Sequence, residues 1–582
     1  MKRKSLLFLA MTLVLTTVIN LFAGFAVFAA DGDAANEIVA EQPTGEGTSE
    51  NPYQITKAGH LVWIKNHLDS YYKLMESIDL NGATWSALDT FTGVLDGNGY
   101  TISDFVLNEE SATDSATFIN TLGATGDRAV VKNLTFDTVT LSTSLKAHTG
   151  VLVGTVIGGS EIDSITVTNL TAIVTGTNTA NGFGSVVGCL SEASSVSNCN
   201  ATATIQADGY MAWNGALGGL VGKTFGSSSV SNCVADGSIT GSIYSGYIGG
   251  VIGWLDANTS LSYCINRCDI QIDVTTSSKY FQAGGLGGIA YKSTVNIDHC
   301  VNEGTIKGSA VNKAVYMGGL IARAQENLNI TNSINIGAVS TETAGSYAGG
   351  IFGHQNGYST NITNTYNLGE INAPNKGFIG ASQGSSVGGS GTAVYTVGDQ
   401  SVIDANTIDK RFNAIAETKE NIEKMVSYQN ILTEVAEHLT GISTDLYGYQ
   451  TSAEVDGKYN LRLVATISGD YTKCQNVGFE AAVTYTIGEA DPITKEATIV
   501  SNNLYRAIKA TENGADTATD IAAEALGGDY IFVLVCKNLP ANAENVTFTV
   551  TTFYTDANGD RIYSETKTTT ITLPGDNVTS AT

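Results

Sequence analysis

A glycine-rich block of five residues recurs seven times along the 582-residue chain. The blocks lie at residues 150–154, 184–188, 218–222, 249–253, 284–288, 318–322 and 349–353. Successive blocks begin 31 to 35 residues apart, and a fixed period of this length is the signature of a repeat architecture. The repeats are rich in Gly, Ser, Thr, Asn and Val with alternating apolarity, which favours strands over helices. The period therefore predicts a solenoid built from β-strands.

A second motif follows the later glycine blocks and keeps its own register. Each copy starts at a small anchor residue, and the six anchors are Cys199, Cys233, Cys264, Cys300, Ser333 and Thr365. An Ile or Val stands six residues after every anchor. Two residues after the last four anchors stand Asn266, Asn302, Asn335 and Asn367. Neighbouring coils of a parallel stack lie about 4.8 Å apart, so we expect the Cys, Ile and Asn positions to form three columns.

These blocks carry a resemblance to a known family. The string Gly-Gly-Leu-Val-Gly at 218–222 resembles the GLUG motif of secreted and surface proteins of bacteria. The segment 47–102 is similar to the section that precedes GLUG coils, so the resemblance covers about residues 45 to 400. It implies a right-handed parallel β-helix, and it implies little about function because such coils occur in proteins of differing activity.

The sequence divides into seven predicted segments. They are a signal peptide at 1–30, a linker at 31–46, an N-terminal section of the β-helix at 47–110, the β-helix at 111–400, a helical connector at 401–445, a C-terminal β-sandwich-like domain at 446–575 and a tail at 576–582. Helical spacing of apolar residues from Ile408 to Leu439 indicates the connector. Alternating runs at 459–467, 477–487, 530–536, 546–554 and 561–573 indicate the sandwich, and 517–526 adds a short predicted helix.

The first thirty residues predict export. Lys2, Arg3 and Lys4 precede an apolar stretch at 6–28 that ends in Ala29 and Ala30, which is typical of a cleaved signal peptide. The stretch is also long enough for an uncleaved anchor, which is the alternative. With cleavage, we expect a secreted or cell-surface protein of a bacterium without a membrane span. The 30 basic against 56 acidic residues give a net charge of −26, which disfavours nucleic acid as a partner.

Motifs for chemistry are sparse. The Gly-x-Ser-x-Gly string at 380–384 is followed by Ser and Gly where a nucleophile elbow needs a helix, so we interpret it as a loop. Cys264 and Cys268 have only His299 as a further ligand candidate, so no metal site or cofactor is predicted. The Cys column is interpreted as packed thiols, with bridges between adjacent coils as the alternative. Catalytic residues are not predicted.

Polar and aromatic residues next to the glycine blocks are the candidate ligand-binding residues. They are Lys223, Tyr247, Trp254, Tyr316, Arg323, Tyr347 and His354. If they face outward, they form a stripe in which aromatic faces pack on sugar rings while polar groups bind hydroxyls. The alternative is a purely structural role, in which these side chains stack on one another and stabilise the edge of the coil.

These observations favour a non-catalytic protein that binds glycans or surface proteins along its β-helix. The first alternative is a polysaccharide lyase or glycoside hydrolase, for which Asp236, Arg267 and Glu303 would stack on adjacent coils as acid, base and acid. Such a stack is also an ordinary surface charge ladder. The second alternative is a structural spacer that displays the C-terminal module.

Overall fold

The in-register stack that the period predicts is present in the computed structural model. Residues 38–580 are described apart from 110–115, 178–179, 211–213, 244, 275–280, 312–313, 326, 356–358, 384–387, 441–442, 452–456, 469–473, 489, 502–504, 507–529, 556–560, 565 and 572–578. The predicted signal peptide and the predicted helix at 517–526 lie outside the described residues, as do residues 556–560, which carry the sequence signal of a hairpin turn between the runs 546–554 and 561–573.

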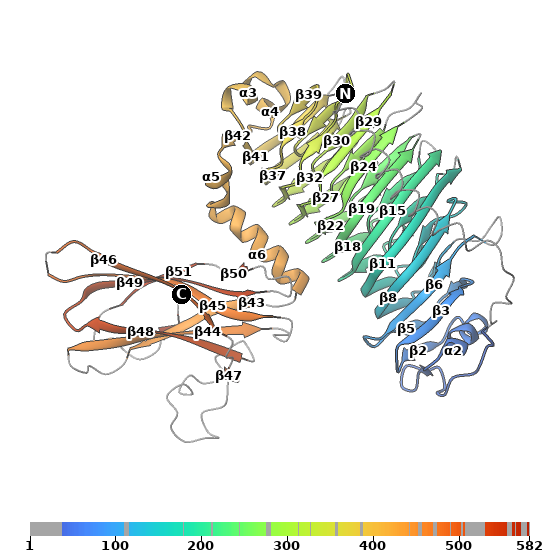
Figure 1. The fold of residues 1–582 in the computed structure, drawn as a ribbon, viewed down its shortest axis with the longest axis horizontal. Coiled ribbons are helices and arrows are strands. Elements are labelled where there is room, and N and C mark those ends of the chain that lie inside the picture. The colour runs from blue at the N-terminus through green and yellow to red at the C-terminus, as the bar shows by residue number, and fades with distance from the viewer. Residues whose placement is uncertain are drawn as a thin grey trace, which may run out of the picture.

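Three parallel sheets wind into a β-solenoid that runs from the blue to the yellow end of the chain in Figure 1. A sheet of ten strands contains β4 (Leu88–Phe91), β7 (Ile119–Leu122), β10 (Val153–Val156), β13 (Val187–Leu190), β17 (Val221–Thr224), β21 (Ile252–Asp256), β26 (Gly287–Tyr291), β31 (Ile321–Ala324), β36 (Phe352–Gln355) and β40 (Gly380–Gln383). A sheet of eight contains β9 (Thr149–Gly150), β12 (Gly182–Gly184), β16 (Ala216–Gly218), β20 (Gly246–Gly249), β25 (Phe281–Gly284), β30 (Val315–Gly318), β35 (Tyr347–Gly349) and β39 (Asn375–Gly377).

The third and largest sheet has 24 strands and forms the remaining side of each coil. Its strands are β1 (Tyr53–Ile55), β2 (Tyr71–Leu74), β3 (Ile78–Thr84), β5 (Val94–Asp96), β6 (Thr101–Leu107), β8 (Val130–Thr143), β11 (Glu161–Thr177), β14 (Ser195–Ser197), β15 (Asn200–Tyr210), β18 (Ser229–Ser231), β19 (Val234–Ile243), β22 (Ser260–Ser262), β23 (Ile265–Asn266), β24 (Asp269–Val274), β27 (Val295–Asp298), β28 (Val301–Asn302), β29 (Ile306–Ala310), β32 (Leu328–Thr331), β33 (Ile334–Asn335), β34 (Val339–Ser340), β37 (Ser359–Asn367), β38 (Ile371–Asn372), β41 (Gly388–Val397) and β42 (Ile415–Glu417).

The predicted register is confirmed position by position. The first glycines of the seven blocks pair in sequence from Gly150 to Gly349, and one further coil adds Gly377. The Ile column pairs in the same way, from Ile205 through Ile239 to Ile371. A single apolar core runs through the coils, because one side of every strand points inward.

The Asn column is a buried ladder of hydrogen bonds. Asn266 Nδ2 donates to Asn302 Oδ1 at 2.7 Å, Asn302 to Asn335 at 2.7 Å, and Asn335 to Asn367 at 2.8 Å. Asn367 ends the ladder by donating to Thr396 Oγ1 at 3.0 Å. All these side chains are fully buried, so each amide depends on its neighbours for its partners.

The ladder explains why the second glycine of the block recurs. A Cβ atom on Gly285 would lie 2.2 Å from Cγ of Asn302, which is closer than real Cβ contacts come. Gly250, Gly319 and Gly350 stand in the same relation to the other three Asn side chains. The glycine and the asparagine therefore pack together, because the absence of a side chain on the glycine leaves room for the amide of the asparagine.

The Cys column lies inside the coil. Cys199, Cys233, Cys264 and Cys300 are fully buried free thiols, as the favoured interpretation predicted. Ser333 and Thr365 continue the column in the same small slot, and the Ser333 hydroxyl accepts from the backbone N–H of Cys300 at 3.2 Å. Burial raises the pKa of the Cys199, Cys233 and Cys264 thiols well above their ordinary value of 9.0, so these three thiols stay protonated and unreactive.

Short helices close the two ends of the solenoid. At the start, α2 (Ala58–Trp63) and a 3-10 turn (Ile64–Asn66) lie beside the first coils. At the other end stand α3 (Gln400–Ala405) and α4 (Thr407–Arg411). Asp409 of α4 is fully buried and accepts the backbone N–H groups of Phe378, Ile379 and Gly380 at 3.0, 2.8 and 3.3 Å. These groups belong to the last coil, so Asp409 caps an edge that would otherwise lack partners.

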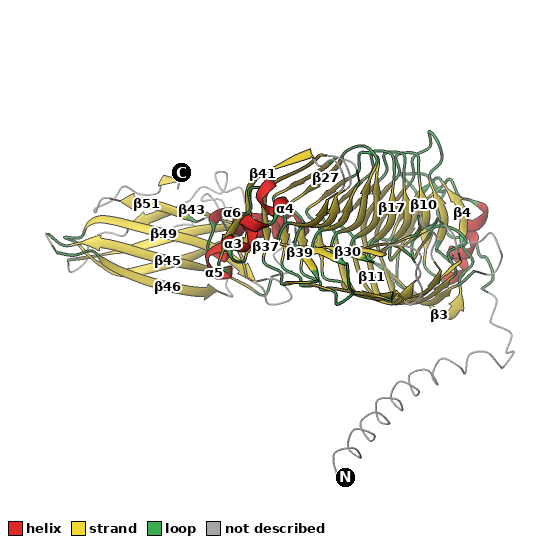
Figure 2. Ribbon diagram, turned by 90° about the horizontal axis from the view of Figure 1, so that it is seen from above, coloured by secondary structure: helices red, strands yellow, loops and turns green. Residues whose placement is uncertain are grey.

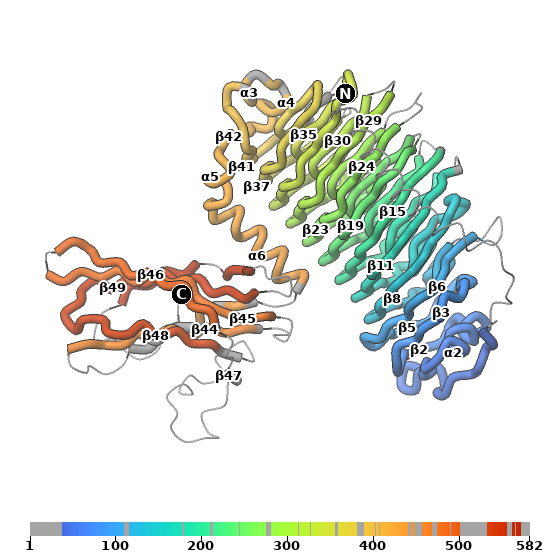
Figure 3. Tube along the Cα trace, viewed as in Figure 1, coloured from blue at the N-terminus to red at the C-terminus, as the bar shows by residue number. Residues whose placement is uncertain are grey.

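The chain then turns back beside the solenoid. Helix α5 (Lys419–Glu423) leads to α6 (Val426–Thr440), and α6 runs toward the C-terminal sheets, as Figures 1 and 3 show. An apolar cluster joins α6 to the large sheet, with Ile265, Val301 and Ile334 on the sheet and Tyr428, Ile431 and Val435 on the helix. The predicted connector is thus helical, and it packs on the solenoid as well as linking it to the next part of the chain.

Two antiparallel sheets follow α6 and share an apolar core. One contains β47 (Tyr505–Arg506), β48 (Tyr530–Pro540), β44 (Lys458–Ser468), β43 (Ser443–Thr451) and β52 (Thr579–Ser580). The other contains β46 (Ile493–Ser501), β45 (Asn476–Thr486), β49 (Glu544–Thr555), β50 (Arg561–Tyr563) and β51 (Lys567–Ile571). Figure 2 shows these sheets beyond the end of the solenoid. The sequence indicated β44, β45, β48 and β49, and its fifth run at 561–573 contains β50 and β51, but it did not indicate β43 or β46.

Candidate functional site

The predicted ligand stripe is in register but does not lie open on the surface. Lys223 pairs with Trp254, and Arg323 pairs with His354 along the ten-stranded sheet. Tyr316 pairs with Tyr347 along the eight-stranded sheet. The two columns meet where each glycine block turns from one sheet into the other.

Three of the seven stripe residues are buried, so the condition that the stripe faces outward is not met for them. Lys223, Tyr247 and Trp254 are only 3%, 2% and 5% exposed. Trp254 packs edge-on against Tyr247 and Tyr291, each with ring centroids 4.9 Å apart. At this position the alternative of side chains that stabilise the coil applies, because neighbouring coils and side chains already cover the ring.

Lys223 is a structural cation of this cluster. Its Nζ donates to the carbonyl oxygens of Ala180 and Asn214 and lies 5.0 Å from the centre of the Trp254 ring. Burial lowers the pKa of Lys223 to about 8. Two carbonyls and an aromatic face satisfy the ammonium group, so little of it is left for a ligand.

The other four stripe residues are half-buried. The rings of Tyr316 and Tyr347 stack with centroids 5.5 Å apart and 12° between their planes, and His354 lies 4.7 Å from Tyr316. Burial and the neighbouring Arg323 lower the pKa of His354 to about 4. Register turns the ring faces toward one another along the solenoid axis. Ligand binding by Tyr316, Arg323, Tyr347 and His354 stays a prediction.

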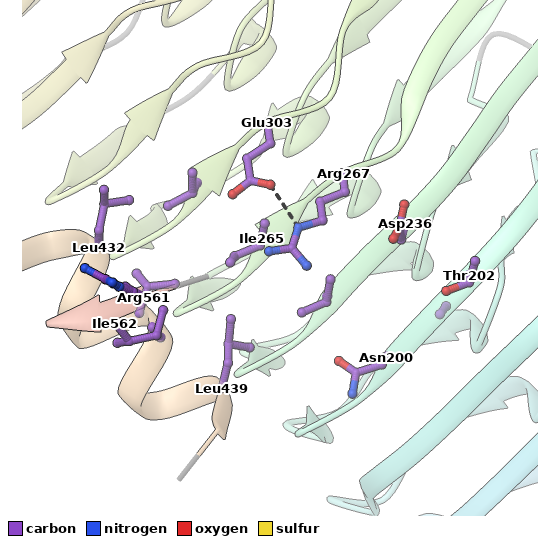
Figure 4. Close-up of a pocket in the computed structure, with 15 residues that line it drawn as sticks. Asn200, Thr202, Asp236, Ile265, Arg267, Glu303, Leu432, Leu439, Arg561 and Ile562 are labelled. Carbon is purple, nitrogen blue, oxygen red and sulfur yellow. Dashed lines mark hydrogen bonds and ion pairs between the residues drawn. The ribbon is translucent and has the colours of Figure 1, made fainter. Parts of the chain in front are cut away.

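A cleft of about 460 Å³ lies where α6 and β50 approach the large sheet (Figure 4). This volume falls in the range of small-ligand sites. The residues that line it are Asn200, Ala201, Thr202, Val234, Asp236, Ile265, Arg267, Val301, Glu303, Leu432, Val435, Ala436, Leu439, Arg561 and Ile562. Three parts of the fold that are far apart in sequence therefore build one concave surface.

The solenoid wall of the cleft repeats with the coils. Val234, Ile265 and Val301 pair in sequence and form an apolar floor. Beside this floor, Arg267 Nε donates to Glu303 Oε2 at 2.9 Å, as the dashed line in Figure 4 shows. Asp236 lies one coil earlier, and its carboxylate accepts the backbone N–H of Gly237. The sequence predicted that an acidic, a basic and an acidic residue stack in this order. The ion pair between Arg267 and Glu303 confirms the stacking of the last two.

The opposite wall is apolar at α6 and charged at the sandwich. Leu432, Val435 and Leu439 line it from the helix, and Arg561 and Ile562 line it from β50. Arg561 bonds Glu480 at 3.2 Å and lies 4.5 Å over the ring of Phe553. An apolar floor and side wall with amide, hydroxyl and charged groups around them suit a ligand with both apolar and hydrogen-bonding faces.

The cleft does not have the geometry of an obvious acid–base pair. The side chains of Arg267 and Glu303 are 32% and 36% exposed, so water reaches both. One oxygen of the Glu303 carboxylate already accepts the hydrogen bond from Arg267 Nε at 2.9 Å, so this oxygen is not free to face a substrate. Among the described residues, no cluster of three His, Cys, Asp or Glu side chains could hold a metal ion.

The segment Gly380–Gln383 is strand β40, so its interpretation as a loop is wrong.

Sequence reasoning missed the cleft, although it singled out part of its wall. The order of Asp236, Arg267 and Glu303 followed from the repeat, but nothing in the period shows that α6 folds back over these coils. One signal was present. Val234, Ile265, Val301 and Ile334 form an apolar column that follows the anchors directly, and it faces α6.

Comparison with known proteins agrees with the repeat. Residues 214–240 match the GLUG motif, and they span β16 to the first part of β19, about one coil. This is a GLUG-motif β-solenoid protein. A relative from Evansella cellulosilytica, named as a Gly-rich membrane protein, is 32% identical over 161 residues, which are 25% of this chain and 18% of the relative. Halomucin of Haloquadratum walsbyi is 32% identical over 124 residues, 19% of this chain and 1% of halomucin.

The matched segments cover less than a fifth of the length of either relative. Within the part of the chain that the structure describes, no helix has the length and apolarity needed to cross a bilayer.

Proposed function

We propose that this GLUG-motif protein is an exported, non-catalytic binding protein, and that the cleft between the large sheet, α6 and β50 is its ligand site. The cleft carries the proposal, because it combines an apolar floor with hydrogen-bonding groups in a volume that suits a small ligand or a short segment of a polymer. The charged N-terminal stretch followed by apolar residues 6–28 supports export to the cell surface or beyond.

Glycans are the first ligand class to test. A sugar ring has apolar C–H faces and a rim of hydroxyls, and the cleft offers the matching pair of surfaces. Val234, Ile265 and Leu439 would contact the C–H faces, while Asn200, Asp236 and Arg267 would bind hydroxyls. A polypeptide segment is the second class, since its side chains and backbone amides make the same kinds of contact.

The binding test uses the secreted full-length chain on arrays of glycans and of surface proteins. Arg267→Ala should weaken any binding in the cleft by about 10-fold or more, since a hydrogen bond to a charged group contributes about 1.5–3 kcal/mol. Lys307→Ala is the matched control, because Lys307 is an exposed cation on β29 of the same sheet and does not line the cleft. Equal binding by the wild type and both variants would refute the cleft as the site.

A polysaccharide lyase or hydrolase is the second candidate. One observation favours it: Asp236, Arg267 and Glu303 meet in one cleft on successive coils. Incubation of the protein with acidic and neutral polysaccharides, followed by measurement of new reducing ends and unsaturated products, tests it. Product that disappears in Glu303→Gln or Asp236→Asn would replace the binding proposal with the enzymatic one.

A further inference from the structure

One corner of the solenoid carries two aromatic residues at positions that asparagine occupies in the neighbouring coils. The residue before each anchor is Asn198, Asn232, Tyr263, His299, Asn332 and Asn364 in turn. All six have a positive φ, between 46° and 54°. Asparagine tolerates this left-handed backbone, whereas an aromatic side chain such as Tyr adopts it rarely. The exchange at Tyr263 therefore costs backbone strain that some other contact has to offset, whereas His299, like Asn, belongs to the residue types that adopt this backbone more readily.

Both exceptional residues contact α6. The ring of Tyr263 stacks on that of His438 with centroids 3.5 Å apart and 11° between their planes. His299 stacks on the other side, 4.8 Å from Tyr263. Its Nε2 lies 2.8 Å from Glu434 Oε2 on α6, and its Nδ1 lies 2.8 Å from Asp298 Oδ2 on the solenoid. The imidazole thus bridges two carboxylates that belong to two different elements.

We infer that Tyr263 and His299 form a pH-sensitive latch that holds α6, and with it one wall of the cleft, against the solenoid. An imidazolium donates to both carboxylates at once. A neutral imidazole has one N–H, so one of the two carboxylates would face a nitrogen lone pair. Protonation of His299 therefore tightens the contact, and loss of the proton loosens it.

The surroundings of His299 agree with this direction. The side chain is 12% exposed, and Asp298, Glu434 and Tyr263 face it directly, while Cys300 and His438 are the further titratable groups beside Tyr263. Burial alone would lower the pKa of His299, but the hydrogen bond and charge of Asp298, together with Glu434, outweigh burial and raise the pKa above 6.5. A raised pKa means that the stabilisation is complete below 6.5 and is lost as the pH rises through the folded value.

The consequence for ligands rests on the proposed function, but the latch itself does not. Leu432, Val435 and Leu439 of α6 line the cleft, and Glu434 lies among them on the same helix. Release of Glu434 would let this wall move away from Ile265 and Val301. A binding protein built in this way holds its ligand more tightly in mildly acidic surroundings than in alkaline ones.

Hydrogen–deuterium exchange of the full-length chain without ligand tests the latch directly. Exchange of the α6 amides, corrected for the intrinsic effect of pH, should become about two- to fivefold faster between about pH 6 and about pH 9, the factor that corresponds to a partly exposed ion pair. His299→Asn places in the column the residue that other coils use, so we expect it to fold. In this variant α6 should exchange fast at both pH values.

Glu434→Gln should behave like His299→Asn, because it removes the second carboxylate of the bridge. Glu420→Gln is the control, since it removes an equal charge from α5, where Glu420 pairs with Lys424 in solvent. It should keep the pH dependence of the wild type. Exchange of α6 that does not change with pH in the wild type, or that changes equally in His299→Asn, would overturn the latch. Because no ligand is present, either result leaves the proposed binding function to its own test.

Discussion

Replacement of Asn302 by alanine should destabilise the solenoid far more than loss of one side chain on the surface. The substitution leaves three buried groups without partners: one N–H of Asn266, Oδ1 of Asn335 and the carbonyl oxygen of Gly304, which now bond Asn302 at 2.7, 2.7 and 3.1 Å. An unpaired buried polar group costs about 1–3 kcal/mol, and neighbouring losses overlap in part. We therefore expect the free energy of unfolding to fall by about 3–6 kcal/mol.

A matched control is available one coil further on. Asn329 is also in an Asn ladder, where it donates to Asn296 at 2.8 Å and accepts from Asn361 at 3.0 Å, but that ladder is exposed. Water replaces its lost partners, so Asn329→Ala should change stability by less than about 0.5 kcal/mol. Guanidinium denaturation followed by far-UV circular dichroism measures both variants. Similar losses for Asn302→Ala and Asn329→Ala would refute the claim that the buried ladder ties the coils together.

Three further predictions concern packing, capping and thiol chemistry. Gly285→Ala should lower the free energy of unfolding by about 1–3 kcal/mol, and with it the denaturation midpoint, because the new Cβ would lie 2.2 Å from Cγ of Asn302. An unchanged midpoint would show that the ladder can accommodate the added methyl group. Asp409→Ala should cost more than Asp409→Asn in the same assay, since the Asn oxygen can still accept from backbone N–H groups of the last coil, and an equal cost would argue against capping. Iodoacetamide at about pH 8 should modify the half-exposed Cys536 in the folded chain, whereas it should modify Cys264 only after denaturation. Mass spectrometry of the peptides measures both reactions. Rapid labelling of Cys264 in the folded chain would contradict its burial.

The repeat made the solenoid predictable from the sequence. Glycine blocks and Asn positions at a constant spacing leave one arrangement in which like residues meet, and pairs such as Gly218 with Gly249 follow directly. The buried state of Cys264 also followed, because a position that accepts Cys, Ser or Thr is a small slot. Register is a local property of successive coils, so the sequence contains it.

The sequence did not predict in the same way where the side chains point or which neighbouring residues pack over them. The period places Trp254 after Lys223, but it does not say that Tyr247 and Tyr291 close over the ring. The cleft depends on contacts between Ile265 and α6 that are far apart in sequence, and no repeat encodes them. The sequence shows that His299 stands where other coils have Asn, which was a sign of a special role. Its contact with Glu434, however, is visible only in the folded chain.

A crystal structure of the full-length chain tests the central claim most directly, because the account depends on coils that stack in register with α6 laid across them. Such a structure should place Asn266, Asn302, Asn335 and Asn367 in one unbroken line of side-chain hydrogen bonds inside the solenoid, with Glu434 against His299 on the outside. Asn side chains that point to solvent, or coils offset so that Gly285 no longer lies against Asn302, would contradict the fold and the cleft built on it.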